Sequence, residues 1–240
     1  MTEESAETEQ QPQNLPLFGS GWRGPLLQKV KLSLKKLLPA AVVREIQAYR
    51  SYEVCDRSTY LKLRLGNGFG PAKPKLPRIS GTTRSIVFVC FGNIMRSPAA
   101  EALMKRELES RPDLRLNVTS AGLNAIPGRA AHPWAIAAAR EFGVSLENHR
   151  ARLLTTDLVA QADVIFAMDY QNQVQLLSRW TDSKKKVFML SAYAGEHYDS
   201  AEIRDPYYLG PEETRRCYEI LSICVRNLVS TFTHQTPPVA

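Results

Sequence analysis

One stretch of this 240-residue chain, residues 85–108, constrains the fold more than any other. Residues 86–90 (IVFVC) are apolar, mostly β-branched or aromatic, and predict a short buried strand. From Ser97 onward the sequence predicts a helix, because Ser97 is a good N-cap and Pro98 suits the first helical position. A strand that leads through a tight loop into a helix is a building unit of α/β folds with a parallel sheet.

The loop between this strand and this helix has the properties that a phosphate dianion requires. The backbone amides of residues 91–96 can surround three phosphoryl oxygens near the positive end of the helix dipole. Gly92 and Asn93 tolerate the left-handed backbone that such a turn demands. The planar guanidinium group of Arg96 can bind two of the oxygens, which a lysine could not do.

Cys90 stands at the start of the loop, where a thiol is expected to ionise at neutral pH and to act as a nucleophile. Ser97 is placed to donate a hydrogen bond to that thiolate. The spacing from Cys90 to Arg96 alone is weak evidence, and a structural cysteine is the alternative interpretation. The preceding strand, Gly92 and the Ser-Pro pair after the arginine favour an anion-binding nucleophile.

These residues, CFGNIMRSP, resemble the phosphate loop of low-molecular-weight protein tyrosine phosphatases. The resemblance covers about residues 84–232 and includes four further motifs in the order of that family. They are SAG at 120–122, HRAR at 149–152, MD at 168–169 and DPYY at 205–208. The resemblance implies a protein-tyrosine phosphatase, a phosphoric monoester hydrolase that forms a phosphocysteine on Cys90. It implies no cofactor and no metal.

Asp205 is the second candidate catalytic residue. A phosphate monoester of a phenol cleaves faster when an acid protonates the departing oxygen. The resemblance assigns Asp205 as this acid, and then as the base that activates water on the phosphocysteine. From the residues alone, an aspartate followed by Pro206 in a polar loop is more typical of a turn.

Aromatic and apolar side chains beside the loop favour phosphotyrosine as the substrate. Tyr207 and Tyr208 follow Asp205 directly and can form walls for a flat ring, with Phe91 and Ile94 on the opposite side. Phosphatases of this fold that act on phosphoarginine typically carry threonine at the position of Ile94. They also lack the tyrosine pair.

Other positions match the family as supports of the loop. The resemblance places Asn93, Ser97, Ser120 and His149 in a hydrogen-bond network that braces it. Met95 belongs to the phosphate-binding loop but departs from many members of the family, which carry a second cysteine there. That cysteine can form a protective disulfide with the nucleophile, and a methionine cannot.

The rest of this region predicts strands that alternate with helices. Further strands are expected at 116–120, 164–167 and 186–189, and helices at 132–142, 171–179 and 211–233. This pattern predicts a parallel sheet of about four strands with helices on both faces. In such sheets the site lies at the carboxyl ends of the strands, where Cys90 falls.

The chain divides into regions of different composition. We expect a disordered tail at 1–20, a basic and helical extension at 21–65, a linker at 66–82 rich in Gly, Pro and Lys, and the phosphatase domain at 83–235. Residues 21–82 carry 13 Lys and Arg against 3 Asp and Glu, whereas residues 83–240 carry 18 against 17. The basic character therefore belongs to the extension, and no nucleic-acid partner is expected.

Two interpretations of residues 21–65 stay open. Apolar residues recur at helical spacing over residues 26–38 and 40–52, so these helices can pack on each other or on the domain. Alternatively, a basic amphipathic helix binds an anionic membrane surface or a protein partner. The sequence has neither a signal peptide nor an apolar run long enough for a membrane span, so we expect a cytoplasmic protein, with peripheral membrane attachment under the second interpretation.

Two other functions compete with the phosphatase. Arsenate reductases share this fold and loop, but they need further cysteines to relay a disulfide, and Cys217 and Cys224 lie far beyond the expected position near residues 165–169. A phosphate-binding module without turnover would not need both Cys90 and Asp205. The predicted partner is a tyrosine-phosphorylated protein substrate, such as a tyrosine kinase.

Overall fold

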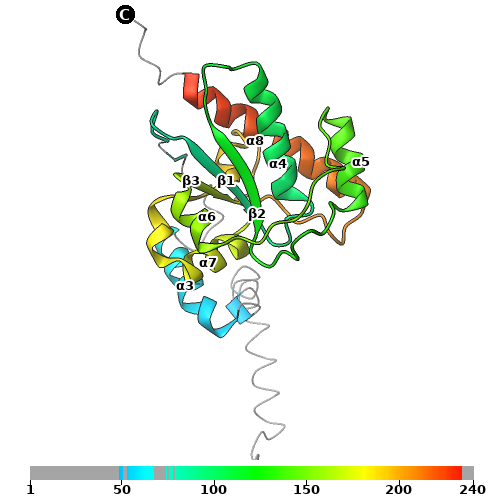
Figure 1. The fold of residues 1–240 in the computed structure, drawn as a ribbon. Helices are drawn as coiled ribbons and strands as arrows, with labels where there is room; N and C mark the ends of the chain where they lie inside the picture. The colour runs from blue at the N-terminus through cyan, green and yellow to red at the C-terminus, as the bar shows by residue number, and fades with distance from the viewer. Residues whose placement is uncertain (1–48, 51–52, 68–73, 75, 78, 234–240) are drawn as a thin grey trace, which may run out of the picture. The chain divides into compact units, whose positions relative to one another are not determined.

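The computed structural model describes residues 49–50, 53–67, 74, 76–77 and 79–233, and a four-stranded parallel sheet lies at its centre. The strands are β1 (Ser85–Cys90), β2 (Asn117–Gly122), β3 (Val164–Ala167) and β4 (Val187–Met189), in the spatial order β2-β1-β3-β4. β1 pairs with β2 along one edge and with β3 along the other, both in parallel. The predicted fold class and parallel sheet are confirmed (Figure 1).

Helices cover both faces of this sheet. The described α-helices are α3 (Val54–Asn67), α4 (Arg96–Glu109), α5 (Pro133–Glu141), α6 (Thr156–Gln161), α7 (Tyr170–Arg179) and α8 (Pro211–Thr233), and short 3-10 helices occupy Thr181–Lys185 and Leu190–Tyr193. α4, α5 and α8 lie on one face and α6 and α7 on the other, and α3 packs on α7 (Figure 1). The predicted helices correspond closely to α5, α7 and α8. The sequence did not indicate α6, because its six residues are too few for apolar positions to recur at helical spacing.

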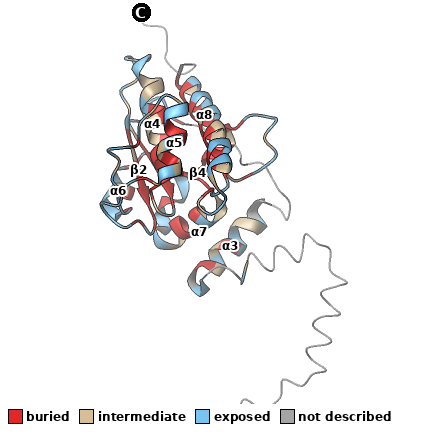
Figure 2. Ribbon diagram, turned by 90° about the vertical axis from the view of Figure 1, so that its right-hand side faces the viewer, coloured by how far each residue is buried: buried red, intermediate tan, exposed pale blue. Residues whose placement is uncertain are grey.

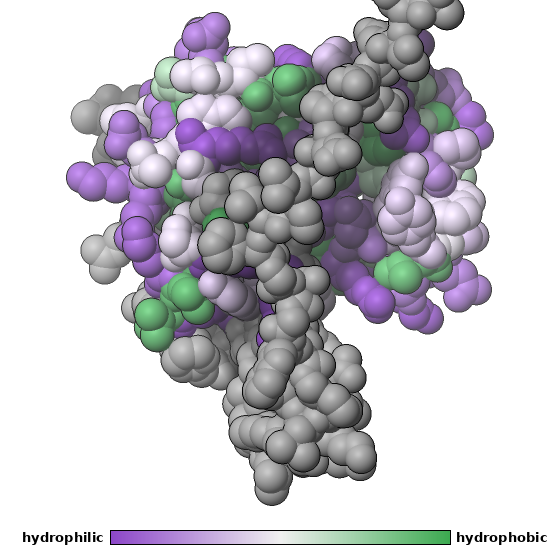
Figure 3. Space-filling view, turned by 90° about the horizontal axis from the view of Figure 1, so that it is seen from below, coloured by the Kyte–Doolittle hydropathy of each residue, from purple (hydrophilic) through white to green (hydrophobic). Residues whose placement is uncertain are grey.

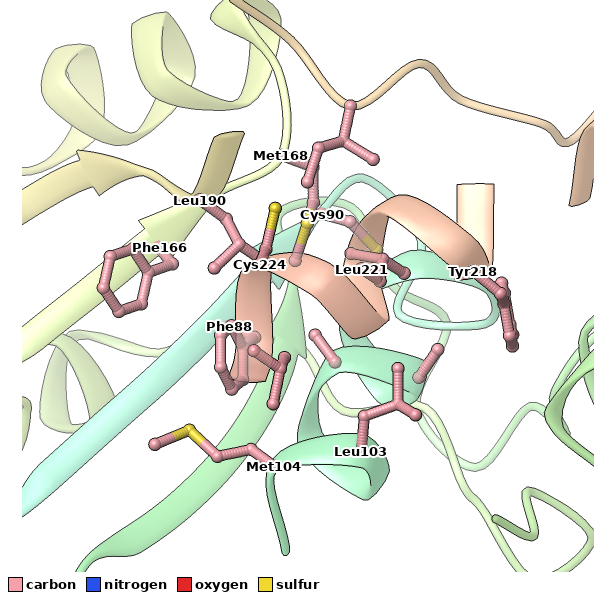
Figure 4. Close-up of a cluster of buried hydrophobic side chains, with 14 of the residues drawn as sticks. Phe88, Cys90, Leu103, Met104, Phe166, Met168, Leu190, Tyr218, Leu221 and Cys224 are labelled. Carbon is pink, nitrogen blue, oxygen red and sulfur yellow. The ribbon is translucent and has the colours of Figure 1, made fainter. Parts of the chain in front are cut away.

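The apolar run in β1 is explained by burial on both faces. Ile86 and Phe88 belong to the core beneath α4 and α8, whereas Val87 and Val89 belong to the core beneath α6 and α7. Successive side chains of a strand point to opposite faces, so a central parallel strand needs apolar residues throughout. Cys90 ends this strand within the first core (Figure 4), and buried positions line the inner sides of α4 and α8 (Figure 2).

The start of α4 differs from the prediction. Ser97 was predicted as the N-cap, but the helix begins at Arg96 and Met95 takes the cap position without a side-chain hydrogen bond. The prediction was wrong because the Ser97 hydroxyl has tertiary partners in the loop. It lies 3.0 Å from Cys90 Sγ and accepts a hydrogen bond from Asn93 Nδ2 at 2.9 Å.

α3, which precedes the region that resembles the phosphatases, packs against α7 (Figure 2). Ser178 Oγ donates a hydrogen bond to Thr59 Oγ1 at 3.0 Å, and the Arg64 guanidinium lies 5.2 Å from the centre of the Tyr170 ring. Tyr60 of α3 is buried.

The predicted tail at 1–20 and the predicted helix at 26–38 lie outside the described residues, as does nearly all of the predicted helix at 40–52. The predicted boundary between extension and linker, at 65/66, falls inside α3, and the proposed domain division stays a prediction. None of the described helices combines the length and the apolar composition that crossing a bilayer requires.

Candidate active site

The loop after β1 curls around the sulfur of Cys90. The Asn93 backbone N–H donates a hydrogen bond to Cys90 Sγ at 3.3 Å, and Ser97 Oγ lies 3.0 Å from the same sulfur. Asn93 adopts the left-handed conformation with φ of 52°, as predicted, but Gly92 does not, so that part of the prediction was wrong. One left-handed residue is enough to turn the chain back toward the sulfur.

Asn93 is the centre of the hydrogen bonds behind the loop. Its Nδ2 donates to Ser97 Oγ at 2.9 Å and to Ser120 Oγ at 2.8 Å, and its Oδ1 accepts from the Arg152 backbone N–H at 2.8 Å. His149 Nε2 lies 2.7 Å from the Asn93 carbonyl oxygen, which can only accept, so Nε2 must carry the proton. Asn93, Ser97 and Ser120 are fully buried, and the loop is therefore held rigid from its inner side.

The SAG turn at the end of β2 packs directly against the loop. A Cβ atom on Gly122 would lie 2.8 Å from both the Asn93 nitrogen and the Phe91 carbonyl oxygen. Both contacts are with backbone atoms, which cannot move aside without reshaping the loop. Only glycine fits at this point of close approach.

Arg96 is almost completely buried, at 1% exposure, and is held by two carboxylates. Its Nη1 donates to Asp169 Oδ2 at 2.5 Å and to the Ile203 carbonyl at 3.0 Å, and its Nη2 donates to Asp205 Oδ2 at 2.5 Å. Burial lowers the pKa of the guanidinium, but the charges of Asp169, Asp205 and Cys90 outweigh this and raise it. Arg96 is therefore a permanent cation beside the sulfur.

Asp169 is a site residue that the sequence analysis missed. It follows β3 at the carboxyl edge of the sheet, and its Oδ1 also accepts from the Asn172 backbone N–H at the start of α7. The MD motif of the resemblance contained this residue without indicating its role. The contact with Arg96 spans 73 residues of sequence, and only the folded sheet brings the two together.

A cavity of about 570 Å³ opens from the loop to the surface. Among its lining residues, nine were predicted for the site: Cys90, Phe91, Gly92, Ile94, Met95, Arg96, Asp205, Tyr207 and Tyr208. The predicted residues Asn93, Ser97, Ser120 and His149 lie behind the loop, where they form the hydrogen bonds described above. Five lining residues were not predicted: Asn124, Ile126, Arg129, Arg204 and Leu209. Their position just after the SAG turn or beside Asp205 was the available signal.

Asp205 and the two tyrosines form one side of the cavity. The Asp205 side chain is 43% exposed, and its Oδ1 accepts from the Tyr207 backbone N–H at 3.2 Å. The Tyr207 and Tyr208 rings meet edge to face, with centres 4.7 Å apart, and the His132 ring lies 5.4 Å from that of Tyr207. Phe91, 44% exposed, also borders the cavity, so aromatic rings are available to contact a flat substrate.

Two further cysteines whose side chains the structure describes are unsuited to chemistry at this site. Cys217 and Cys224 of α8 are buried in the core, and burial raises the pKa of each to about 12. Both are therefore protonated at neutral pH and poor nucleophiles. In the described part of the chain, no cluster of His, Cys, Asp and Glu side chains could hold a metal ion.

Comparison with known proteins places this geometry in a family. The family model described as low molecular weight phosphotyrosine protein phosphatase matches residues 85–237. The chain belongs to this family. The match confirms the predicted family and, with it, the predicted class of enzyme, a hydrolase of the protein tyrosine phosphatase class.

Relatives within the family carry two kinds of name. The chain is 41% identical over 123 residues to the protein-arginine-phosphatase of Bacillus subtilis. That alignment covers 51% of this chain and 79% of the relative. The chain is 36% identical over 143 residues to the low molecular weight protein-tyrosine-phosphatase Wzb of Escherichia coli, in an alignment that covers 59% and 90%. The crystal structure of the tyrosine phosphatase AmsI of Erwinia amylovora superimposes with a TM-score of 0.57 at 29% identity, over 65% of this chain and 98% of that one.

Proposed function

We propose that this protein hydrolyses phosphotyrosine through a phosphocysteine intermediate on Cys90. The observation that supports this most is the arrangement at the base of the cavity. There the sulfur lies within hydrogen-bond distance of Ser97 Oγ and the Asn93 amide, beside an arginine that also holds Asp205. A nucleophile, a phosphate-binding cation and an acid thus meet in one cavity.

The first step transfers the phosphoryl group to sulfur. The loop amides and Arg96 bind the phosphoryl oxygens, so Arg96 exchanges its bond to Asp205 for one to the substrate. The Cys90 thiolate attacks phosphorus, and the bond from phosphorus to the phenolic oxygen breaks. Asp205 takes up a proton from solvent once Arg96 has released it and passes this proton to the departing oxygen, so neutral tyrosine leaves.

The second step restores the thiolate. Asp205, left as a carboxylate, removes a proton from a water molecule that attacks phosphorus. The bond between sulfur and phosphorus breaks, and the electron pair returns to Cys90. Ser97 lies 3.0 Å from that sulfur, so its hydroxyl stabilises the departing thiolate, and inorganic phosphate is released.

Phosphoarginine is the second candidate substrate, because the relative at 41% identity is a protein-arginine-phosphatase. Three features of the cavity favour phosphotyrosine instead. Ile94 lines it in place of a polar residue, the Tyr207 and Tyr208 rings form one side, and Arg129 and Arg204 add positive charge. Of the described residues that line the cavity, Asp205 is the one carboxylate, and it is paired with Arg96. A guanidinium group on the substrate would face these cations.

The natural substrate under this proposal is a tyrosine-phosphorylated protein, such as a tyrosine kinase, in the cytoplasm. Cys90, Cys217 and Cys224 are unpaired, which is consistent with a reducing compartment.

Attachment of residues 21–65 to an anionic membrane surface or to a protein partner stays a prediction. The arsenate reductase alternative lacks support among the described thiols, because Cys217 and Cys224 are buried and protonated.

The deciding experiment compares two peptides of one sequence, one with phosphotyrosine and one with phosphoarginine. We expect kcat/KM for the phosphotyrosine peptide to exceed that for the phosphoarginine peptide by at least about 100-fold, since a mispaired charge in a binding site is costly. Cys90→Ser, the control, should hydrolyse neither. A preference for phosphoarginine would overturn the substrate assignment, and full activity of Cys90→Ser would overturn the mechanism.

A further inference from the structure

Two arginines border the outer part of the cavity, beyond the phosphate-binding loop. Arg129 comes from the loop between β2 and α5, and Arg204 comes from the loop that carries Asp205. Both side chains are exposed, and neither forms an ion pair with another of the described residues. Figure 3 looks onto the face at the carboxyl ends of the strands, where many of the described side chains are hydrophilic.

Arg129 is held in place at the mouth of the cavity. Its Nη2 donates a hydrogen bond to the Tyr207 hydroxyl at 3.2 Å, at the outer end of the aromatic side of the cavity. Its charge also reaches His132, whose pKa is lowered by partial burial and by Arg129. A guanidinium group has five N–H donors, so the bond to Tyr207 leaves most of them available for an anion.

Arg204 faces the cavity from the other loop. It also borders a small neighbouring hollow that contains Glu213, but Glu213 is paired with Arg216. The carboxylate next to it in sequence, Asp205, is paired with Arg96. Both of these carboxylates therefore already have cationic partners, and Arg204 forms no ion pair with another described residue, so its charge is left for a ligand.

The charge of a bound phosphate is accounted for without these two arginines. The loop amides and Arg96 surround the phosphoryl position, at the bottom of the cavity. We expect a phenyl ring that extends from this phosphate to contact the tyrosines and Phe91, which line the same cavity. The peptide backbone beside the phosphotyrosine is then expected to lie near Arg129 and Arg204, the exposed arginines of that lining.

We infer that Arg129 and Arg204 form a subsite for a carboxylate side chain next to the phosphotyrosine, so that the substrate is an acidic phosphotyrosyl segment. This inference rests on the proposed function. An exposed arginine pairs best with a carboxylate, which its planar fork can bind through two hydrogen bonds. A lysine beside the phosphotyrosine would meet two like charges.

The test uses the full chain and three peptides that differ only in the residues flanking phosphotyrosine, which are Glu, Gln or Lys. We expect kcat/KM to fall in that order, with the Glu peptide about 10-fold above the Lys peptide at low salt. The ratio should shrink as salt rises, because both arginines are exposed. Each enzyme variant is judged by its own ratio, so a change in overall activity does not affect the result.

Arg129→Gln and Arg204→Gln should each reduce the ratio, and Arg129→Glu should reverse it in favour of the Lys peptide. Arg115→Gln is the matched control, because Arg115 is an exposed arginine just before β2, at the amino ends of the strands, whereas the cavity lies at their carboxyl ends. It should keep the ratio of the unaltered chain. Equal rates for the three peptides, or equal ratios in all variants, would overturn the subsite while leaving the phosphatase intact. Hydrolysis of none of the three, with hydrolysis of a phosphoarginine peptide, would instead overturn the proposed function.

Discussion

The Arg96 guanidinium and the Asp205 carboxylate form an ion pair, with Nη2 and Oδ2 2.5 Å apart, across 109 residues of sequence. The cation that is expected to bind phosphate thus also holds the group that is expected to act as the acid. Under the proposed mechanism, bound phosphate competes for the same Nη2, so substrate binding releases Asp205 for proton transfer. Binding and acid catalysis would then be coupled through one contact.

Asp205→Asn tests the role of the acid. An asparagine keeps the shape but cannot donate a proton to the leaving oxygen, so we expect a loss of about 100-fold or more in kcat/KM, which reports the first step alone, with phenyl phosphate. The loss should be much smaller with p-nitrophenyl phosphate, whose leaving group needs no proton. Equal losses with the two substrates would show that Asp205 is not the acid.

Asp169→Asn tests the second carboxylate on Arg96. Without this charge the buried guanidinium keeps Asp205 as its only described acidic partner, so the pair with Asp205 strengthens and phosphate competes less well. We expect KM for small aryl phosphates to rise and kcat/KM to fall by about 10-fold. Inorganic phosphate should also become a weaker inhibitor, an effect that general loss of structure would not single out. Unchanged phosphate inhibition would argue against a positioning role.

Asp163→Asn should affect stability and leave kcat nearly unchanged. Asp163 lies just before β3, at the amino ends of the strands and so at the end of the sheet away from Cys90. Its Oδ2 accepts hydrogen bonds from the Arg84 and Ser85 backbone N–H groups at 2.7 and 2.9 Å. These two hydrogen bonds lower the pKa of Asp163 below its usual value of 3.8. The stabilisation is therefore present above about pH 4 and is lost as pH falls through the lowered pKa. Thermal melts should show a lower Tm for the variant at pH 7 and a shrinking difference toward pH 3.

We expect Met95 to make oxidation of Cys90 hard to reverse. A cysteine at this position could capture a sulfenic acid on Cys90 as a disulfide, whereas methionine forms none. Cys217 and Cys224 cannot substitute, because both are buried and their pKa values are raised to about 12. After peroxide treatment, dithiothreitol should restore little activity to the unaltered chain and more to Met95→Cys. Mass spectrometry that finds a disulfide between Cys90 and another native cysteine, with full recovery on reduction, would contradict this.

Two truncated chains test whether α3 contributes to stability. A chain that begins at Tyr49 keeps the contacts of α3 with α7, whereas one that begins at Arg84 loses the buried Tyr60 and uncovers Tyr170. We expect the shorter chain to melt on the order of 5 °C lower, because buried apolar area is lost. The chain from Tyr49 should keep the Tm and kcat of the full chain. Equal melting of both truncated chains would show that α3 adds no stability.

Local sequence was sufficient where neighbouring residues act on one another. The run from Ile86 to Val89 predicted a strand buried on both faces, since every position is apolar. The order of residues from Cys90 to Arg96 predicted a tight loop between a strand and a helix, which the structure contains, whereas anion binding by this loop stays a prediction. Short-range geometry of this kind is encoded within about ten residues.

Tertiary structure decided which side chains meet across the sheet. Asp169 reaches Arg96 only because β3 lies beside β1, and Arg129 and Arg204 border one cavity only because their loops both leave the same edge. Ser97 shows the same limit at short range: its propensity to cap a helix was overridden by Cys90 and Asn93. Capping contributes about 1 kcal/mol, whereas a buried hydroxyl without partners costs more, so the packed loop determined where Ser97 points.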